Sequence, residues 1–189
     1  TARLEDVWGS AGNDIFTVGS ATTVGANRYY TVLNYNGSGW SRMTTPTVPA
    51  GKSGKLLSIW GSGPSDVWAV GEDGITLHYN GSNWSSIASG VTEHLYGVWA
   101  SASNNAYAVG LFGAIIRYNG SIWSPVTIAG SGTGYIAGEN ITIWNPVTDL
   151  AFSTEGKLFA STNRQGIYAS SNEARNWVNM SAPPYATYA

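Results

Sequence analysis

One seven-residue pattern occurs three times in the chain and constrains its fold more than any other feature. It reads YNGSGWS at 35–41, YNGSNWS at 79–85 and YNGSIWS at 118–124. Each copy lies late in a longer unit, and these units begin with LEDVWGS from Leu4, LLSIWGS from Leu56 and LYGVWAS from Leu95. Self-similarity at a period of about 40 residues indicates a repeat architecture built from one supersecondary unit.

A fourth, more divergent unit begins at Val147. There VTDLAFSTEGKLFAST aligns without a gap with LEDVWGSAGNDIFTVG of the first unit, and Asp149 matches Asp6. We therefore treat 1–189 as one domain with a long irregular link at 131–146. Its units cover 4–45, 56–90, 95–130 and 147–180.

Each unit contains four apolar runs of strand length. In the second unit they are LLSIW, DVWAVG, ITLHY and WSSIA, which are rich in β-branched and aromatic residues and bounded by turn formers. The first two runs are almost continuously apolar, which is typical of strands buried on both faces. A four-stranded unit of this length is a β-propeller blade. The sequence predicts an all-β propeller of about four four-stranded antiparallel blades, forming a closed or a partial ring.

The repeat unit resembles the tandem propeller repeats of bacterial secreted and surface proteins. In the last unit, SSNEARNW at 170–177 resembles the Asp-box of BNR-type propellers, S-x-D-x-G-x-x-W. Ser170 and Trp177 match this motif, whereas Asn172 replaces its Asp and Ala174 its Gly. The resemblance implies a propeller fold and an extracellular or cell-surface location, but it specifies no activity because propellers host many functions.

The repeated pattern itself predicts hairpins and packing anchors. Asn-Gly between two strands indicates a type I′ turn, in which both central residues have positive φ. The tryptophans that follow are expected to pack between blades as large apolar anchors: Trp40, Trp84, Trp123 and Trp177. The first-strand tryptophans Trp8, Trp60 and Trp99 are expected to wedge between neighbouring blades.

The same turns contain N-x-S/T sequons, which would carry sugar in a source that glycosylates. The sequons are at Asn36, Asn80, Asn83, Asn119, Asn140 and Asn179. Turn chemistry is the favoured interpretation of the three that coincide with Asn-Gly.

Composition and motifs argue against several classes of function. The chain has no Cys, a net charge of −2 and no basic run, so neither a Cys-based metal site nor nucleic-acid binding is expected. No apolar stretch is long enough to span a membrane. The sequence does not begin with Met and shows no signal peptide, so we expect a processed protein or a section of a longer one.

No arrangement of residues indicates catalysis, a metal or a cofactor. No phosphate-binding loop, dinucleotide fingerprint or nucleophile elbow is present. Glu72 and Asp73 are adjacent, whereas two-carboxylate hydrolysis needs acids on opposite sides of a bond. His78 shares its repeat position with Asn34 and Arg117, which we interpret as a solvated strand face. We predict that the protein is not an enzyme.

Candidate binding residues come from the places where the repeat changes length. The first-to-second and third-to-fourth turns are constant, but the second-to-third turns and the links between blades vary, and 20–30 is an insert in the first unit. These variable segments share one face of a propeller, where binding sites commonly lie. The candidates are Arg28, Tyr29, Tyr30, Glu72, Asp73, Leu111, Phe112, Tyr135 and Trp144.

These observations predict a non-catalytic extracellular recognition module. Exposed aromatic and polar side chains suit a lectin-like, carbohydrate-binding site, and the partner is expected to be a glycan or an extracellular protein. The alternative is a structural subunit of a surface layer, appendage or larger assembly, with self-association or further blades of the same chain. A sialidase-like glycosidase is a third, less favoured class. Equally, the candidate aromatic residues could cover the core.

Overall fold

The computed structural model describes residues 2–126, 147–153, 157–162, 166–170 and 178–179. They form four antiparallel sheets of four strands each, and in every sheet the strands follow one another in chain order. No α-helix occurs in these residues; the helical turns η1 (Glu72–Gly74) and η2 (Leu111–Gly113) are of the 3-10 type. The all-β prediction of four-stranded blades is confirmed.

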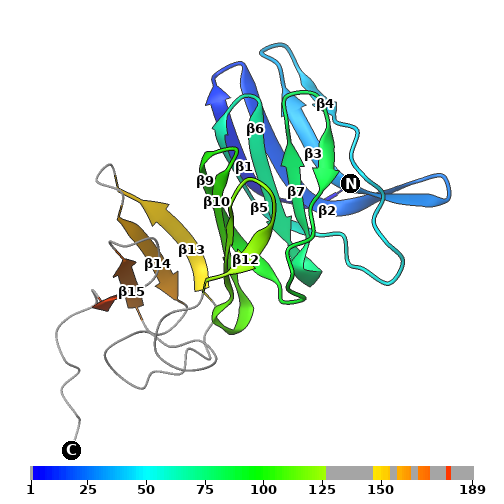
Figure 1. Ribbon diagram of the computed structural model, residues 1–189. Helices are drawn as coiled ribbons and strands as arrows, with labels where there is room; N and C mark the ends of the chain where they lie inside the picture. The colour runs from blue at the N-terminus through cyan, green and yellow to red at the C-terminus, as the bar shows by residue number, and fades with distance from the viewer. Residues whose placement is uncertain (1, 127–146, 154–156, 163–165, 171–177, 180–189) are drawn as a thin grey trace, which may run out of the picture.

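The strands of blades one and two are bounded as follows. Blade one comprises β1 (Leu4–Ala11), β2 (Asp14–Val24), β3 (Asn27–Tyr35) and β4 (Trp40–Arg42). Blade two comprises β5 (Leu56–Gly63), β6 (Asp66–Gly71), β7 (Thr76–Tyr79) and β8 (Trp84–Ser86). The insert in the first unit lengthens β2 and β3 into an extended hairpin, which projects from the body of the molecule (Figure 1).

Blades three and four repeat the arrangement. Blade three comprises β9 (Leu95–Ala102), β10 (Asn105–Gly110), β11 (Ile115–Tyr118) and β12 (Trp123–Pro125). Blade four comprises β13 (Val147–Phe152), β14 (Leu158–Thr162), β15 (Gly166–Ser170) and β16 (Val178–Asn179). The blades stack in an open arc with blades one and four at its two ends, so the ring is not closed (Figure 1).

Three hydrophobic cores lie between neighbouring blades. The first core joins Phe16 and Val32 of blade one to Ile59 and Leu77 of blade two. The second joins blade two to blade three, and the third joins blade three to blade four. We call the side of a blade that faces the preceding blade its leading face, and the side that faces the next blade its trailing face. The three cores cover both faces of blades two and three.

The tryptophans of the first strands wedge onto the following blade, as predicted. The ring of Trp8 lies so close to Gly61 that a Cβ there would be 2.4 Å from it. Trp60 donates its indole N–H to the carbonyl oxygen of Ala100 at 3.2 Å. Trp99 packs against the core shared by blades three and four.

The tryptophans that open the fourth strands pack onto the preceding blade, with one exception. Trp84 and Trp123 are buried, and the Trp123 ring meets Trp68 of blade two edge-on. Trp40 is 51% exposed, so its predicted role as a packing anchor is wrong in this structure. The physical reason is that no described blade precedes blade one. Trp177 lies outside the described residues.

In each of the first three blades, a glycine late in the second strand leaves room for the segment that leads into the first strand. A Cβ at Gly19, Gly71 or Gly110 would lie 1.9–2.0 Å from a carbonyl oxygen of the segment that leads into the first strand. These oxygens belong to Arg3, Lys55 and His94, and each accepts a hydrogen bond from the residue after its glycine. Close backbone approach thus explains why the pattern V-G recurs.

The Asn-Gly hairpins exist, but they are not of type I′. Tyr35 pairs with Trp40, which leaves a four-residue loop at 36–39. Gly37 has φ of 91°, whereas Asn36 is not among the residues with positive φ. Instead, the side-chain oxygen of Asn36 accepts hydrogen bonds from the amides of Ser38 and Gly39 at 3.0 and 3.1 Å. Because the Asn side chain caps the loop, it needs no left-handed conformation.

In each of blades one to three, side-chain hydrogen bonds connect the turn between the first and second strands to the third strand. In blade two, Asp66 accepts hydrogen bonds from the hydroxyl of Ser62 and contacts His78 Nε2 at 2.6 Å. The His78 ring also stacks on Trp68, with ring centroids 4.1 Å apart. The interpretation of this strand position as a solvated face is therefore wrong for His78, because both contacts hold its side chain against the blade.

The tryptophan positions provide a matched test of the packing. Trp84→Ala should lower the free energy of unfolding by about 3–5 kcal/mol, as expected when a buried aromatic side chain leaves a cavity. Trp40→Ala, the same change at the same repeat position, should cost less than about 1 kcal/mol. Urea denaturation of both variants measures the difference, and equal costs would contradict the packing scheme.

Candidate functional site

The two faces of the arc differ as the turn lengths predicted. On one face the constant turns touch: a Cβ at Gly37 would lie 2.9 Å from the Cβ of Asn13, and Gly81 meets Ser65 in the same way. On the other face the variable turns contact the links. There the amide of Glu72 donates to the carbonyl of Lys55 at 3.0 Å, and that of Leu111 to His94 at 2.8 Å.

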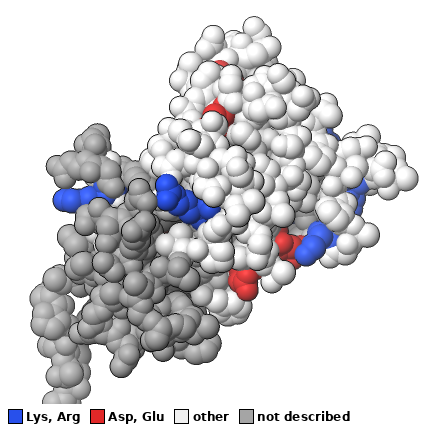
Figure 2. All heavy atoms as spheres, viewed as in Figure 1, with Lys and Arg blue, Asp and Glu red and all other residues white. Residues whose placement is uncertain are grey.

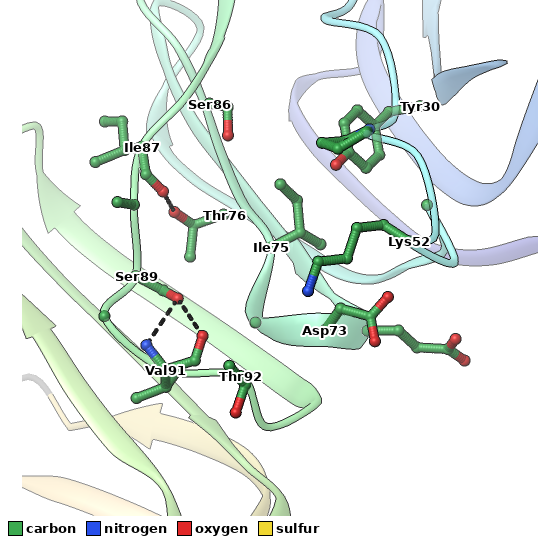
Figure 3. A pocket seen from close by; sticks show the side chains of 16 residues that line it. Tyr30, Lys52, Asp73, Ile75, Thr76, Ser86, Ile87, Ser89, Val91 and Thr92 are labelled. Carbon is green, nitrogen blue, oxygen red and sulfur yellow. Dashed lines mark hydrogen bonds between the residues drawn. The ribbon is translucent and has the colours of Figure 1, made fainter. Parts of the chain in front are cut away.

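A pocket of about 450 Å³ opens on this variable face, at the boundary between blades one and two (Figure 3). Tyr30 of β3 and the link at 49–54 form one side. The turn η1 and the start of β7 form its floor, and the segment 86–92 closes the other side. The walls are aliphatic, with hydroxyl groups between them. The aliphatic side chains are Pro49, Ile75, Ile87 and Val91, and the hydroxyl groups belong to Thr76, Ser86, Ser89 and Thr92.

Most polar groups at the pocket hold its frame. The Asp73 carboxylate accepts a hydrogen bond from the amide of Ser53 at 2.8 Å, and the Asp73 amide donates to Nδ1 of His94 at 3.0 Å. Ser89 caps its own turn through Val91, and Thr76 donates to the carbonyl of Ile87. Segments from three parts of the chain are thereby fixed around one cavity.

Lys52 differs from these framework residues. It is exposed, and its side chain extends over the pocket with the ammonium group on the pocket side of Asp73 (Figure 3). Glu72, by contrast, faces Lys55 with its carboxylate 3.9 Å from the ammonium nitrogen. The cation of Lys52 is thus available to a bound anionic group.

Tyr30 lines the pocket from within the core. Only 2% of the residue is exposed, so the expectation that it stands free on the binding face is wrong. Burial raises the pKa of the Tyr30 phenol above its usual 10.0, and the nearby negative charge of Asp73 raises it further. The phenol is therefore neutral in the range where proteins function.

Arg28 and Tyr29 fix the link instead of lining the cavity. Arg28 donates from its guanidinium to the carbonyl oxygens of Lys52 and Ser53, at 2.9 and 2.5 Å. Tyr29 forms a β-bridge with Thr47, and the guanidinium carbon of Arg42 lies 5.8 Å from its ring centroid. Both candidates thus support the pocket from its outer side.

The turn η2 is the counterpart of η1 in blade three and carries an exposed aromatic side chain. Phe112 is 63% exposed and has φ of 56°, while Leu111 is half-buried. The equivalent residue, Asp73, has φ of 59°, but there an acidic side chain caps the link. A left-handed conformation is unusual for a bulky residue such as Phe. His94 contacts both turns, so Phe112 and the pocket belong to one face.

The remaining candidates are placed as follows. Tyr135, Trp144 and Asn140 lie outside the described residues. Asn36, Asn80 and Asn119 each cap a hairpin loop through the side-chain oxygen, and Asn83 lies in the second of these loops. Asn179 ends β16.

Sequence reasoning missed Lys52 and the segment 86–92. Both lie in links between blades, whose lengths vary, so the length signal pointed to the correct segments. It did not identify the residues, because irregular links have no periodicity that shows which side chains face inward.

A second cavity of about 440 Å³ follows the first strands of the blades. Asp6, Trp60, Trp99 and Asp149 are among its lining residues. The Asp6 carboxylate accepts the amides of Val7 and Ile59 at 2.8 and 2.9 Å, so it serves the backbone. Asp149 accepts the amide of Leu150 in the same way. This repeated bond supports the alignment of the fourth unit with the first.

The side of the molecule in Figure 2 shows no basic patch that would attract a polyanionic partner. Charged side chains are few and scattered on the side shown, with no patch of one sign (Figure 2). Among the described residues, no group of three or more acidic or His side chains is arranged to hold a metal ion. The described helical turns are also too short to cross a membrane.

Comparison with solved structures identifies similar folds. The chain matches YCF48 bound to a D1 peptide with a TM-score of 0.54 and 20% identity, covering 95% of this chain and 68% of that one. It matches YCF48 from Cyanidioschyzon merolae with a TM-score of 0.60 and 20% identity, over 94% and 55% of the two chains. The extracellular domain of BT4673 from B. thetaiotaomicron gives 0.60 and 12%, over 95% and 25%.

These neighbours are propeller-like repeat folds, so the propeller prediction is confirmed at the level of the fold. This chain spans about half the length of the C. merolae protein and a quarter of the BT4673 domain. No protein-family model matches the sequence, and a search of curated proteins gives no significant match.

The conformation of Phe112 can be tested by substitution. Phe112→Asn should leave the protein as stable or raise its free energy of unfolding by up to about 1 kcal/mol, since Asn tolerates the left-handed region. Ile122→Asn is the control, because Ile122 is also exposed, at 58%, but has no positive φ. It should change stability by less than about 0.5 kcal/mol. A clear loss for Phe112→Asn in thermal unfolding would show that the ring stabilises the fold.

Proposed function

We propose that this chain is a non-catalytic recognition module that acts outside the cell and binds a peptide segment of another protein on its variable face. The observation that carries the proposal is the pocket between blades one and two. It combines aliphatic walls with one available cation on a rigid frame. Sites of this kind, apolar with a few placed polar groups, bind ligands.

The chemistry of the pocket indicates which peptide would fit. Pro49, Ile75 and Ile87 offer apolar contacts, while Lys52 offers a positive charge at the rim. A segment with an apolar side chain and a neighbouring carboxylate, either Asp, Glu or a chain terminus, complements both features. Charge-assisted hydrogen bonds to the ammonium would fix its direction.

The exposed Phe112 adds a second contact. Phe112 is 63% exposed and is held in a left-handed conformation that a bulky side chain rarely adopts. Such strain is characteristic of sites that bind. Aromatic side chains are also enriched where proteins meet partners.

At the pocket itself a peptide is favoured over a glycan, because the aromatic residue that lines it, Tyr30, is buried. Sugar rings stack on exposed aromatic faces, but Tyr30 is in the core and the Tyr29 ring lies beside Arg42. One similar fold, YCF48, has been solved with a bound peptide, and another is an extracellular domain. Both support the proposal, as does the resemblance of the repeat, including its Asp-box-like last unit, to secreted bacterial propellers.

Binding can be tested with a peptide library and a glycan array presented to the same protein. We expect selection of peptides that pair an apolar residue with a carboxylate. Lys52→Glu should weaken the selected peptide by at least about tenfold, the value of a lost hydrogen bond to a charged group. Lys157→Glu makes the same charge change on the constant face of blade four and should have little effect.

Binding that is confined to the glycan array would replace the peptide with a carbohydrate ligand and restore the lectin-like interpretation. Binding to neither array, or equal losses for both lysine variants, would contradict the proposed site.

We also predict no hydrolysis of sialosides or aryl glycosides. Glu72 faces Lys55, and the Asp73 carboxylate holds the amide of Ser53, so the two acids are not arranged across a bond. Turnover of a chromogenic aryl glycoside that disappears in Glu72→Gln, while the fold is retained, would show the protein to be an enzyme.

A further inference from the structure

The leading face of blade one carries three of the eight large apolar side chains that are exposed in the described part of the chain. Leu4 is 48% exposed, Val7 61% and Trp40 51%. These three residues come from β1 and β4. Ile15 of β2 and Leu33 of β3 lie on the same face of the blade and are half-buried. We call these five residues the open face.

The repeat shows what becomes of this surface when a blade covers it. The counterparts of Leu4, Val7 and Trp40 in blade two are Leu56, Ile59 and Trp84, which are 0%, 2% and 6% exposed. Those in blade three are Leu95, Val98 and Trp123, at 0%, 5% and 5%. The same side chains are thus buried in blades two and three, each of which has a preceding blade.

The open face also retains the receptor for a wedge tryptophan. In blade two this receptor is Gly61, whose missing Cβ leaves the space that the ring of Trp8 fills. Gly9 occupies the same position in β1 and is exposed. The nearest atoms to a Cβ at Gly9 are at 3.2 Å and belong to blade one itself. A tryptophan could therefore seat on Gly9 as Trp8 seats on Gly61.

Two further features indicate that blade one is built as an internal blade. Terminal repeats of repeat proteins carry a polar outer face. On the leading face of blade one the strand register places Thr17 and Arg42 beside Leu33, but Leu4, Val7 and Trp40 are exposed apolar side chains there. The segment before β1 also follows the path of the links between blades. The carbonyl of Arg3 accepts the amide of Ser20 at 2.8 Å, just as that of Lys55 accepts Glu72 and that of His94 accepts Leu111.

We propose that the open face binds another blade of this same repeat type, which carries a tryptophan at the wedge position and lies outside residues 1–189. A second copy of this chain fits less well. Its free end is blade four, where the wedge position is occupied by Ala151. Monomeric proteins rarely leave an apolar patch of this kind exposed.

The occupant can be supplied and its effect measured. A second copy of blade two can be joined before Thr1 of the full chain, through the link that follows blade two in this protein. The fusion then has one more blade, placed before blade one. Fluorine NMR with 5-fluorotryptophan reports on Trp40, whose resonance is assigned from Trp40→Phe. In the parent chain, where Trp40 is 51% exposed, a soluble paramagnetic agent should broaden this resonance strongly. In the fusion the broadening should fall towards that of Trp84 and Trp123, which are 6% and 5% exposed.

The control is the same fusion with Trp60→Ser made only in the duplicate, which removes the wedge. It should restore most of the exposure of Trp40. Unchanged exposure in the parent fusion would overturn the proposal.

A second measurement needs no fusion. Sedimentation of the 189-residue chain should show a monomer over a wide concentration range. A dimer that dissociates in Val7→Asp would identify a second copy as the occupant and overturn the proposal. Because this test involves no peptide ligand and no pocket residue, its outcome is independent of the proposed function.

Discussion

The fold depends on the packing of one blade against the next, because no blade encloses a core of its own. A four-stranded sheet of this length has two apolar faces and little between its own strands to bury. The tryptophan wedge solves this problem in a directional way, since Trp8 reaches forward to Gly61 while Trp84 reaches back to Phe16. Each interface is thereby closed from both sides, and burying large aromatic rings supplies the driving force. The stability of any blade is set by its neighbours, as in other repeat proteins.

This constraint also determines where variation can occur. The loops at 36–39 and 80–83 press on the first turns of their blades, so their length and their Asn-Gly pair are fixed by contact. The links at the opposite face contact the second-to-third turns and, before blade two, the long hairpin of blade one. Their lengths differ between blades, and the pocket forms where Tyr30 of blade one and the link at 49–54 face η1. A rigid scaffold with one variable face is the common arrangement for binding proteins.

The sequence was sufficient to predict the strands, the blades and the variable face, because all three follow from repetition and length. It was insufficient where one neighbour decides the outcome. Trp40 lies in almost the same local sequence as Trp84, but it is exposed because no described blade packs on its side of blade one. Tyr30 lies in an insert, yet the link at 44–49 covers it. The type I′ turn was wrong because the Asn side chain, not its backbone, provides the capping hydrogen bonds. Lys52 carried no local signal, since its role depends on a cavity formed by distant segments.

The position of the pocket connects recognition to the architecture. Its walls come from both blade one and blade two, so a ligand seated there contacts both sides of one interface between blades. Any ligand that binds the assembled interface stabilises it by mass action. The pairing of Asp73 with Ser53 and His94 extends the frame from the link before blade two to the link before blade three. Two links are thus hydrogen-bonded to one turn, and the aliphatic walls and Lys52 meet at that place.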